Sequence, residues 1–410
     1  MAMRVLLAWE LGGNWGHARR LEAVARALQR RGHEVHLAVQ DLGPFLNMSH
    51  LTQTHPDQAN DQPGARLWQA PLWGGLLRFS PIRPLGPPRR FGDLLANLGL
   101  QDPAALEPLL RAWETLFHAI RPDVLVADFA PSALLAARGR LPRIAIGTGF
   151  TVPPTHLAEF PPFPGAEPDP QTAGPLIAEP LLLAKVNATL ARIGRPTLDR
   201  LPQITEAEAL MPAVFAELDP YRGLRSMPHL SPFLAGPLPS RPATREGIFA
   251  YLPGRSLTEA GFATLLALGP SVLAVMPDLD APRRAALVAA GVRLSDKTLG
   301  WGQIATHAAV LCNGGMGTVS QSLAMGLPLA VLPGGVEQDL TARALAAWGL
   351  SIDLVTLADP LALLRAGQRA EALASDFRTR LSDPALAVAE QAETLAKGTT
   401  CEMVHKPETS

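Results

Sequence analysis

The sequence predicts an α/β protein with two domains, each built on a doubly wound parallel β-sheet. The chain has 410 residues, which exceeds the roughly 100–200 residues of an ordinary domain. Short apolar runs alternate with amphipathic helical patterns twice along the chain, once before and once after residues 231–245. The connections between these runs are short, as in right-handed βαβ units, which form parallel sheets.

The first series begins with the apolar run Arg4–Trp9. After a glycine-rich turn, a helical pattern starts near His17, and Gly32 is placed to end it. The next strand is predicted over Glu34–Val39. The pattern then repeats as a strand over 123–128, a helix from about Ser132 and a strand over 143–147.

The second series sets the domain boundaries. Its strands are predicted over 247–252, 271–276, 308–312, 328–332 and 351–355. We therefore predict an N-terminal domain over 1–230, a linker over 231–245 and a C-terminal domain over 246–381. Ser382-Asp383-Pro384 has the pattern of a helix start. We expect a last helix over 382–398 that crosses back to the N-terminal domain, closed by Gly398 and followed by a flexible tail over 399–410.

The composition excludes several classes of protein. With 36 basic and 37 acidic residues, the chain carries no excess positive charge to bind nucleic acid or an anionic membrane. No unbroken apolar stretch reaches the ~18 residues of a membrane span. Cys312 and Cys401 are too few for a disulfide framework or a cysteine zinc site. We expect a cytoplasmic protein without a metal, in which the triplet Asp278-Leu279-Asp280 caps a helix.

A glycine-rich turn follows the strand predicted over 308–312. The turn, Gly314-Gly315-Met316-Gly317-Thr318, leads directly into a helical pattern. Glycines let the backbone approach a ligand closely, and the free N–H groups of a helix start point at an anion. The turn therefore predicts a site for a phosphate or diphosphate.

The residues around this turn resemble the donor motif of the family 1 GT-B glycosyltransferases, which include macrolide and sterol glycosyltransferases. The chain reads NGGMGTVSQSLAMGLP from residue 313 and PGGVEQDLTA from residue 333, in register with that motif throughout. The resemblance implies a GT-B fold of two Rossmann-like domains facing a cleft. It also implies that Gly314, Gly315, Gly317 and Thr318 receive the diphosphate of a nucleotide sugar, and that Glu337 and Gln338 bind hydroxyls of the sugar.

Two positions depart from the family motif. Asn313 stands where the family has a diphosphate-contacting His, and Gln321 stands where it has a ribose-binding Glu. Gln321 keeps the ability to bind the ribose hydroxyls without a charge. We predict that Arg255, next to Ser256 in the turn after the first strand of this domain, replaces the missing positive charge at the diphosphate.

The N-terminal half contains the residues expected to carry the chemistry. Gly16-His17 opens the first helix, and Asp128 ends the strand that reads VLVAD, as in the family pattern. The resemblance implies that His17 is the general base that deprotonates the acceptor and that Asp128 holds it. An adjacent carboxylate selects one imidazole tautomer and stabilises the cation that forms on proton transfer.

Two stretches, 68–91 and 150–175, combine aromatic residues with many prolines. Long irregular segments in compact domains are often functional. We expect them to form walls of an apolar acceptor site, and irregular packing against the sheet edge is the alternative interpretation. Together with Trp15 of the glycine-rich turn before the first helix, the expected acceptor residues are Trp15, Trp68, Trp73, Phe79, Phe150, Phe160 and Phe163.

Together these features predict an inverting, metal-independent glycosyltransferase that uses a UDP- or dTDP-sugar and no cofactor. The expected partners are the nucleotide sugar and a small apolar or aromatic acceptor. The sequence leaves open a nucleotide-sugar 2-epimerase, a catalytically weakened helper protein and a transferase acting on a lipid-linked sugar. A dinucleotide site at Leu11-x-Gly13-x-x-Gly16 with Asp41 is a further alternative. The identity of the sugar and the oligomeric state also stay open.

Overall fold

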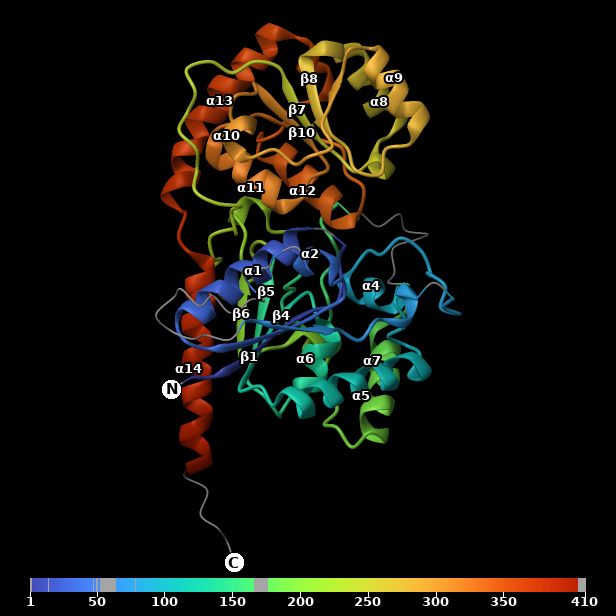
Figure 1. Ribbon diagram of the computed structural model, residues 1–410. Coiled ribbons are helices and arrows are strands. Elements are labelled where there is room, and N and C mark those ends of the chain that lie inside the picture. Colours follow the sequence, from blue (N-terminus) through green and yellow to red (C-terminus); the bar gives the residue numbers. More distant parts are fainter. Residues whose placement is uncertain are drawn as a thin grey trace, which may run out of the picture. The chain divides into compact units, whose positions relative to one another are not determined.

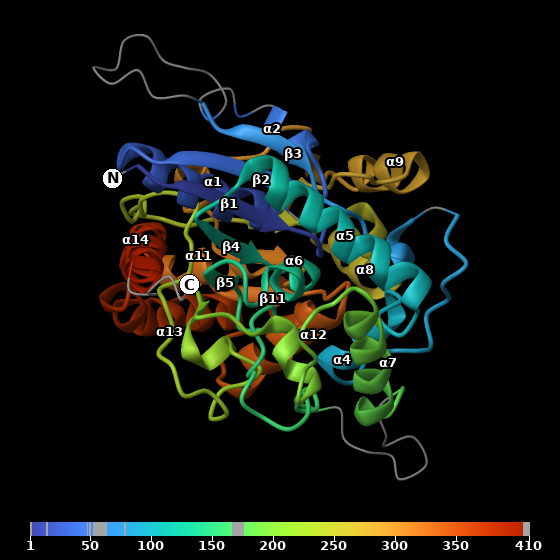
Figure 2. The same cartoon turned by 90° about the horizontal axis from the view of Figure 1, so that it is seen from below.

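The computed structural model describes residues 2–13, 15–46, 48, 51, 64–77, 79–165 and 176–404, with side chains described up to residue 398. The chain divides into two compact units (Figures 1 and 2). Unit 1 comprises Met1–Ala213, Gly223–Leu230 and Asp383–Ser410, and unit 2 comprises Val214–Arg222 and Ser231–Ser382. Each unit contains one parallel β-sheet.

The sheet of unit 1 has six strands in the order β3-β2-β1-β4-β5-β6. All of its strand pairs are parallel. The strands are β1 (Arg4–Trp9), β2 (Glu34–Val39), β3 (Arg66–Gln69), β4 (Val124–Asp128), β5 (Arg143–Gly147) and β6 (Ala209–Pro212). The α-helices are α1 (Trp15–Arg30), α2 (Gly43–Leu46), α4 (Phe91–Asn97), α5 (Pro103–Ile120), α6 (Pro131–Ala137), α7 (Glu179–Arg192) and α14 (Pro384–Val404), with short 3₁₀ turns η1 (Gly74–Leu76) and η2 (Leu201–Thr205).

The sheet of unit 2 has five parallel strands in the order β11-β10-β7-β8-β9. The strands are β7 (Ile248–Tyr251), β8 (Val272–Val275), β9 (Arg293–Leu294), β10 (Ala309–Cys312) and β11 (Leu329–Val331). The α-helices are α8 (Glu259–Leu268), α9 (Ala281–Ala289), α10 (Trp301–Ile304), α11 (Met316–Met325), α12 (Val336–Ala347) and α13 (Pro360–Thr379). The 3₁₀ turns are η3 (Ala216–Leu218), η4 (Gly254–Ser256), η5 (Gly269–Ser271) and η6 (Leu354–Ala358).

Both faces of the sheet in unit 2 are buried, which is why its strands read as continuous apolar runs. Phe249 and Val310 contribute to one core, together with residues of α10, α11, α12 and α13. Ala250 and Leu311, which follow them in sequence, contribute to a second core with residues of α8 and α9. This alternation follows from the period of two along a β-strand. Figure 1 shows the two groups of helices on opposite sides of the strands.

The structure contains strands β3, β6 and β9, which were not predicted, and it differs from the predicted elements at three further places. Residues 351–355 do not form a strand, because pairing stops after the single bridge between Leu329 and Ser351 and the chain turns into η6, whose Leu357 is buried. Residues 214–222 belong to unit 2, because Phe215 packs against Phe377 with ring centroids 4.7 Å apart.

The last helix is the third difference. It starts at Pro384 and continues through Gly398 to Val404, and residues 405–410 of the expected flexible tail lie outside the described residues. A single glycine lowers helix stability by only about 1 kcal/mol, so it need not end a helix that is held by packing.

Helix α14 belongs to unit 1 and packs against α1 (Figure 2). Val388, Ala389 and Ala392 are fully buried. Glu393 accepts two hydrogen bonds from the guanidinium of Arg31, at 2.7 and 2.8 Å. These bonds, with a contact to His33, lower the pKa of Glu393 to about 2. The helix is therefore tied to unit 1 by both apolar packing and an ion pair.

Each sheet reverses its winding direction once. In unit 1 the chain moves outward from β1 to β2 and β3, then returns to β4 on the other side of β1. In unit 2 it moves outward from β7 to β8 and β9, then returns to β10 on the other side of β7. Loops diverge at such a switch point, so ligands of open α/β sheets bind beyond the carboxyl ends of the two strands. The expected sites lie after β1 and β4 and after β7 and β10.

None of the described helices combines the length and apolarity that a transmembrane span requires.

Candidate active site

His17 and Asp128 meet at the switch point of unit 1. His17 lies in the first turn of α1, directly after β1, and Asp128 is the last residue of β4. His17 Nδ1 is 3.1 Å from Asp128 Oδ1, and both side chains are buried. The separation is within hydrogen-bonding distance, although its angles are not those of a regular hydrogen bond. The structure thus brings together the two residues that the sequence assigned to the chemistry.

Arg20 completes this cluster and was not expected from the sequence. Its Nη1 donates to both oxygens of Asp128, at 2.6 and 2.7 Å, and its side chain is buried. Burial by itself raises the pKa of Asp128, but the charge of Arg20 and the neighbouring His17 outweigh it and lower that pKa. His17 and Arg20 are three residues apart, which places them on one face of α1. This three-residue spacing in the predicted helix was the feature of the sequence that could have placed Arg20 beside His17.

Two aromatic rings contact the imidazole. The His17 ring stacks with Trp9 and with Phe129, with centroids 5.3 and 6.1 Å away. Phe129 follows Asp128 directly and has a positive φ of 49°, which is uncommon for a residue other than glycine. Its carbonyl accepts a hydrogen bond from the N–H of Leu11 at 3.1 Å, which joins the loops after β1 and β4. These contacts orient the ring before any ligand binds.

Gly12 packs closely against the other ring nitrogen. Its φ of 81° lies in the left-handed region, and a Cβ at this position would lie 2.4 Å from His17 Nε2. Only a glycine at this position leaves Nε2 uncrowded.

We predict that Gly12→Ala displaces the imidazole. The left-handed backbone costs about 1–2 kcal/mol for an alanine, and the methyl group occupies the space beside Nε2. The free energy of unfolding should fall by about that amount, and catalytic turnover should fall more strongly than nucleotide affinity. Gly13→Ala is the matched control, because a Cβ at Gly13 meets nothing within 4 Å and its φ is not positive. Equal turnover in the two variants would contradict the assignment.

Glu10 supports the same loops from inside the core. Its carboxylate is fully buried and accepts hydrogen bonds from Trp73 Nε1, from the N–H and hydroxyl of Ser132, and from the N–H of Ala133. Burial raises the pKa of Glu10 despite these bonds. Because Ser132 and Ala133 lie at the start of α6, Glu10 holds that helix start beside the carboxyl ends of β1 and β4.

The glycine turn occupies the switch point of unit 2. Gly314 has a φ of 85°, and a Cβ there would lie 3.0 Å from Val331 and 3.2 Å from the carbonyl oxygen of Gln338. Asn313 is buried and its Oδ1 accepts a hydrogen bond from the N–H of Gly315 at 3.2 Å. Helix α11 starts directly afterwards, so its first N–H groups point out of the carboxyl edge of the sheet. This is the geometry of an anion site.

Two further loops reach the turn from the neighbouring strands. Gln338, in the first turn of α12, accepts a hydrogen bond from the N–H of Gly334 through its Oε1 at 2.7 Å. A Cβ at Gly334 would lie 2.6 Å from the hydroxyl of Ser256, which follows β7. The loops after β7, β10 and β11 therefore converge on the helix starts. Glu337, Gln338, Ser256, Gly317 and Thr318 lie within these loops and helix starts.

Arg255 has a carboxylate partner in the structure. It lies in η4, its side chain is two-thirds exposed, and its Nη1 is 3.1 Å from Asp278 Oδ2. An exposed pair of this kind contributes little to stability, so the guanidinium can exchange partners. Asp280 accepts from the N–H of Arg283 and caps α9, as the sequence predicts for the Asp278-Leu279-Asp280 triplet.

Gln321 is placed differently from the ribose contact that the resemblance implies. Its side chain is fully buried, and its Oε1 accepts a hydrogen bond from the N–H of Ala235 at 3.1 Å. The amide thus holds residues 231–235 against α11 within unit 2. A neutral amide is suited to this position, because a buried carboxylate would require a compensating charge.

Most of the expected acceptor residues contribute to the core of unit 1. Trp73, Phe150, Phe160 and Phe163 are buried, and Phe150 and Phe163 pack with centroids 5.5 Å apart. These four fit the packing interpretation of the proline-rich stretches. Trp68 lies in the edge strand β3 and donates to His36, whereas Trp15 and Phe79 are exposed.

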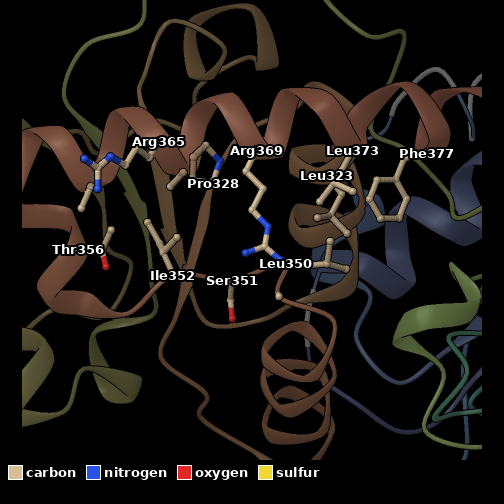
Figure 3. A pocket seen from close by; sticks show the side chains of 14 residues that line it. Leu323, Pro328, Leu350, Ser351, Ile352, Thr356, Arg365, Arg369, Leu373 and Phe377 are labelled. Atoms are coloured by element: carbon tan, nitrogen blue, oxygen red, sulfur yellow. The ribbon is translucent and has the colours of Figure 1, made fainter.

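A cavity of about 340 Å³ lies elsewhere in unit 2, between α13 and residues 349–352 (Figure 3). Its lining is mainly apolar, and Arg369 extends from α13 toward Leu350 and Ser351. Leu323 and Pro328 of the donor motif line it, but none of the predicted site residues does. The cavity is therefore not part of the glycine-turn site.

The part of the chain that the structure describes contains no group of three or more His, Cys, Asp or Glu residues arranged to hold a metal ion.

Comparison with known proteins identifies the fold. No family model matches the chain, and no curated protein sequence matches it. Solved structures do match: the glycotransferase of kitacinnamycin has 19% identity and a TM-score of 0.62, over 96% of this chain and 99% of that one. CalG4, the calicheamicin glycosyltransferase, has 18% identity and a TM-score of 0.61, and the match covers 98% of this chain and 99% of that one. The glycosyltransferase VinC, solved in complex with DTDP, has 15% identity and a TM-score of 0.61, and the match covers 96% of this chain and 100% of that one.

The chain has the GT-B fold. The match extends over almost the whole length of both chains and includes both parallel-sheet units. The fold predicted from the donor motif is therefore confirmed. In the GT-B fold the two switch points, with His17 and Asp128 in one unit and the glycine turn in the other, are the places where function is expected.

Proposed function

We propose that this protein is an inverting, metal-independent glycosyltransferase that moves a sugar from a nucleotide diphosphate to a hydroxyl of a small acceptor. The proposal rests on one observation: functional residues lie at the switch points of both sheets. One holds a buried His–Asp–Arg cluster, and the other holds a glycine turn at a helix start. Acid–base chemistry and diphosphate binding are the two functions that such a transfer requires.

The cluster in unit 1 would provide the base. With Nδ1 carrying its proton toward Asp128, the Nε2 atom beside Gly12 is free to accept a proton from the acceptor hydroxyl. The acceptor oxygen then bonds to the anomeric carbon while the bond from that carbon to the diphosphate oxygen breaks. Attack from the opposite side inverts the anomeric centre. Asp128 remains ionised, because Arg20 lowers its pKa, and stabilises the imidazolium.

The turn in unit 2 would receive the diphosphate. The N–H groups at the start of α11 and the hydroxyls of Thr318 and Ser256 are donors suited to phosphate oxygens. Glu337 and the amide of Gln338 would bind the sugar. Asp278 and Asp280, the candidates for a metal site, are engaged with Arg255 and the start of α9. Charge neutralisation by backbone and arginine supports a reaction without a metal or cofactor.

The acceptor is proposed to be apolar or aromatic, and the donor a dTDP- or UDP-sugar. The apolar surroundings of His17, which include Trp9 and Phe129, would favour an apolar or aromatic acceptor over a highly charged one. The presence of DTDP in the VinC structure makes dTDP the first donor nucleotide to test.

A thermal-shift screen with UDP, dTDP, GDP and their sugars tests the proposal most directly. Binding to the native state raises the melting temperature in proportion to the logarithm of ligand concentration. We expect one nucleotide diphosphate to stabilise the protein, and its sugar to release diphosphate when an acceptor is present. Stabilisation by no nucleotide would overturn the proposal.

The alternatives give different outcomes in the same assay. A nucleotide-sugar 2-epimerase would convert the donor in the absence of any acceptor. A helper protein would bind the nucleotide but release no diphosphate with any acceptor. The engagement of Gln321 with Ala235, rather than an exposed ribose-binding carboxylate, is the observation that keeps the helper protein as a second candidate.

We predict that Arg255→Ala weakens nucleotide-diphosphate binding about tenfold, because an arginine–phosphate contact is charge-assisted. The melting temperature without ligand should stay unchanged, since the exposed pair with Asp278 adds little stability. Isothermal titration with the nucleotide selected above measures the affinity. Arg284→Ala, which removes a similar exposed pair with Asp296, is the control. Unchanged affinity in Arg255→Ala would remove Arg255 from the donor site.

A further inference from the structure

The cavity of unit 2 beside α13 has an apolar floor. Its volume of about 340 Å³ lies at the lower end of the range of small-molecule sites, which is roughly 300–1,000 Å³. Leu323, Pro328 and Phe377 line it and are buried. Ala366 and Ala370, one turn apart on α13, contribute only methyl groups. The cavity is therefore suited to the hydrocarbon body of a small ligand.

Two arginines of α13 line the same cavity. Arg365 and Arg369 are four residues apart, which places them on one face of the helix, and both are exposed. Figure 3 shows Arg369 extending from α13 toward Leu350 and Ser351. Within the described part of the chain, neither arginine makes a hydrogen bond or an ion pair. Both guanidinium groups are therefore available to a ligand at the solvent side of the cavity.

The lining of the cavity supplies no negative charge. None of its 14 residues is an aspartate or a glutamate, and its remaining polar side chains are the hydroxyls of Ser351 and Thr356. Gly349 has a φ of 62°, and a Cβ there would overlap the guanidinium of Arg369, so the glycine leaves room for that group. A guanidinium binds a carboxylate or a phosphate through two parallel hydrogen bonds. The cavity thus combines an apolar interior with two cations that lack a counter-ion in its lining.

The cavity is separate from the glycine-turn site. Leu323 lies in the last turn of α11, Pro328 directly precedes β11, and Gly349 follows the end of α12. The glycine turn lies at the opposite ends of these three elements, at the starts of α11 and α12 and beyond the carboxyl end of β11. A ligand in the cavity therefore leaves the glycine turn accessible.

We propose that this cavity is a second ligand site, which binds a small organic anion with a carboxylate or phosphate group on an apolar body. The apolar body contacts the floor of the cavity, and the anionic group binds Arg365 and Arg369. Burial of the body and charge pairing at the arginines together distinguish such a ligand from an inorganic anion and from a neutral hydrocarbon. The inference goes beyond the proposed function and does not depend on it.

A ligand-observed NMR titration of the full chain tests the proposal, with hexanoate and hexyl phosphate as probes. We expect at least one of them to bind with a dissociation constant in the millimolar range or tighter, and more weakly at high salt. The probe that binds more tightly identifies the anionic group. Acetate, which lacks the apolar body, and hexanol, which lacks the charge, should each bind at least about tenfold more weakly.

Variants locate the binding in the cavity. Arg365→Gln and Arg369→Gln should each weaken binding of the selected probe about tenfold, and Ala366→Leu should weaken it by filling the cavity. The arginines are exposed, so the melting temperatures of their variants should equal that of the wild type. Arg293→Gln and Ala289→Leu make the same chemical changes at exposed positions of unit 2 outside the cavity, and should bind as the wild type does.

Three results would overturn the proposal. The first is that neither hexanoate nor hexyl phosphate binds to the wild type. The second is that hexanol binds as tightly as the charged probes, as in an apolar cavity that does not recognise an anion. The third is that the control variants lose as much affinity as the cavity variants. Because nucleotide stabilisation is measured separately, each of these results leaves the proposed function standing.

Discussion

His17→Ala is expected to reduce sugar transfer by about 10²–10⁴-fold, the usual contribution of a positioned general base. The imidazole is the proton acceptor in the proposed reaction, and no other titratable ring stacks with both Trp9 and Phe129 in the described part of the chain. Steady-state kinetics with the donor and acceptor found by screening give the change in kcat. The nucleotide should still raise the melting temperature, because the glycine turn lies in the other unit.

His118→Ala is the control for this prediction. His118 is exposed in the last turn of α5 and lies outside the cluster, so its loss should leave kcat unchanged. If His17→Ala retained wild-type turnover, His17 would not be the general base of the transfer.

Arg20→Ala is expected to destabilise the protein by about 3–5 kcal/mol near pH 7. Removing one partner of a buried ion pair leaves the other charge buried without compensation. Asp128 is fully buried and would lose both hydrogen bonds from Arg20. Arg19→Ala is the matched control, because Arg19 is the preceding residue, its side chain is 60% exposed, and it contacts Glu22 and the ring of Trp15 rather than Asp128. Urea unfolding measures both variants, and equal stabilities would contradict the buried pair.

The pH dependence of this effect has a definite sign. In the wild type the pKa of Asp128 is lowered, so its ionised form stabilises the native state above the unfolded pKa, and this contribution is lost as the pH falls through the folded pKa. In Arg20→Ala, burial without the guanidinium raises the pKa of Asp128. Protonation at acidic pH then removes the buried charge. The difference in stability between wild type and variant should shrink from about pH 7 to about pH 4.

The sequence alone predicted those features that depend on short segments. Apolar runs of strand length, followed by helical patterns, predicted both parallel sheets, and the glycines after residue 312 predicted the turn at the start of α11. The resemblance paired His17 with Asp128, and their positions agree with it, because His17 lies at the start of the helix after β1 and Asp128 ends β4 of the same parallel sheet. Such ends lie at one edge whatever the details of the packing.

Residues 351–355 show where this reasoning was wrong. Alternating apolar residues predicted a strand, but the structure pairs only Ser351 with Leu329 before the chain turns into η6. A period of two is compatible with a strand, yet pairing also requires a free sheet edge along the whole segment. The apolar Leu357 reaches the core through the turn instead.

Composition, period and spacing along the chain predicted the two-unit α/β fold and the anion-binding turn, and the resemblance to the glycosyltransferase motif implied the His–Asp pair. Only the tertiary structure decided which atoms meet: Arg20 on both oxygens of Asp128, Gln321 on Ala235, and the aromatic residues Phe150, Phe160 and Phe163 packed inside unit 1. The physical reason is that these contacts join segments from 13 to more than 100 residues apart. Their geometry depends on how helices pack on a twisted sheet, which no local pattern encodes.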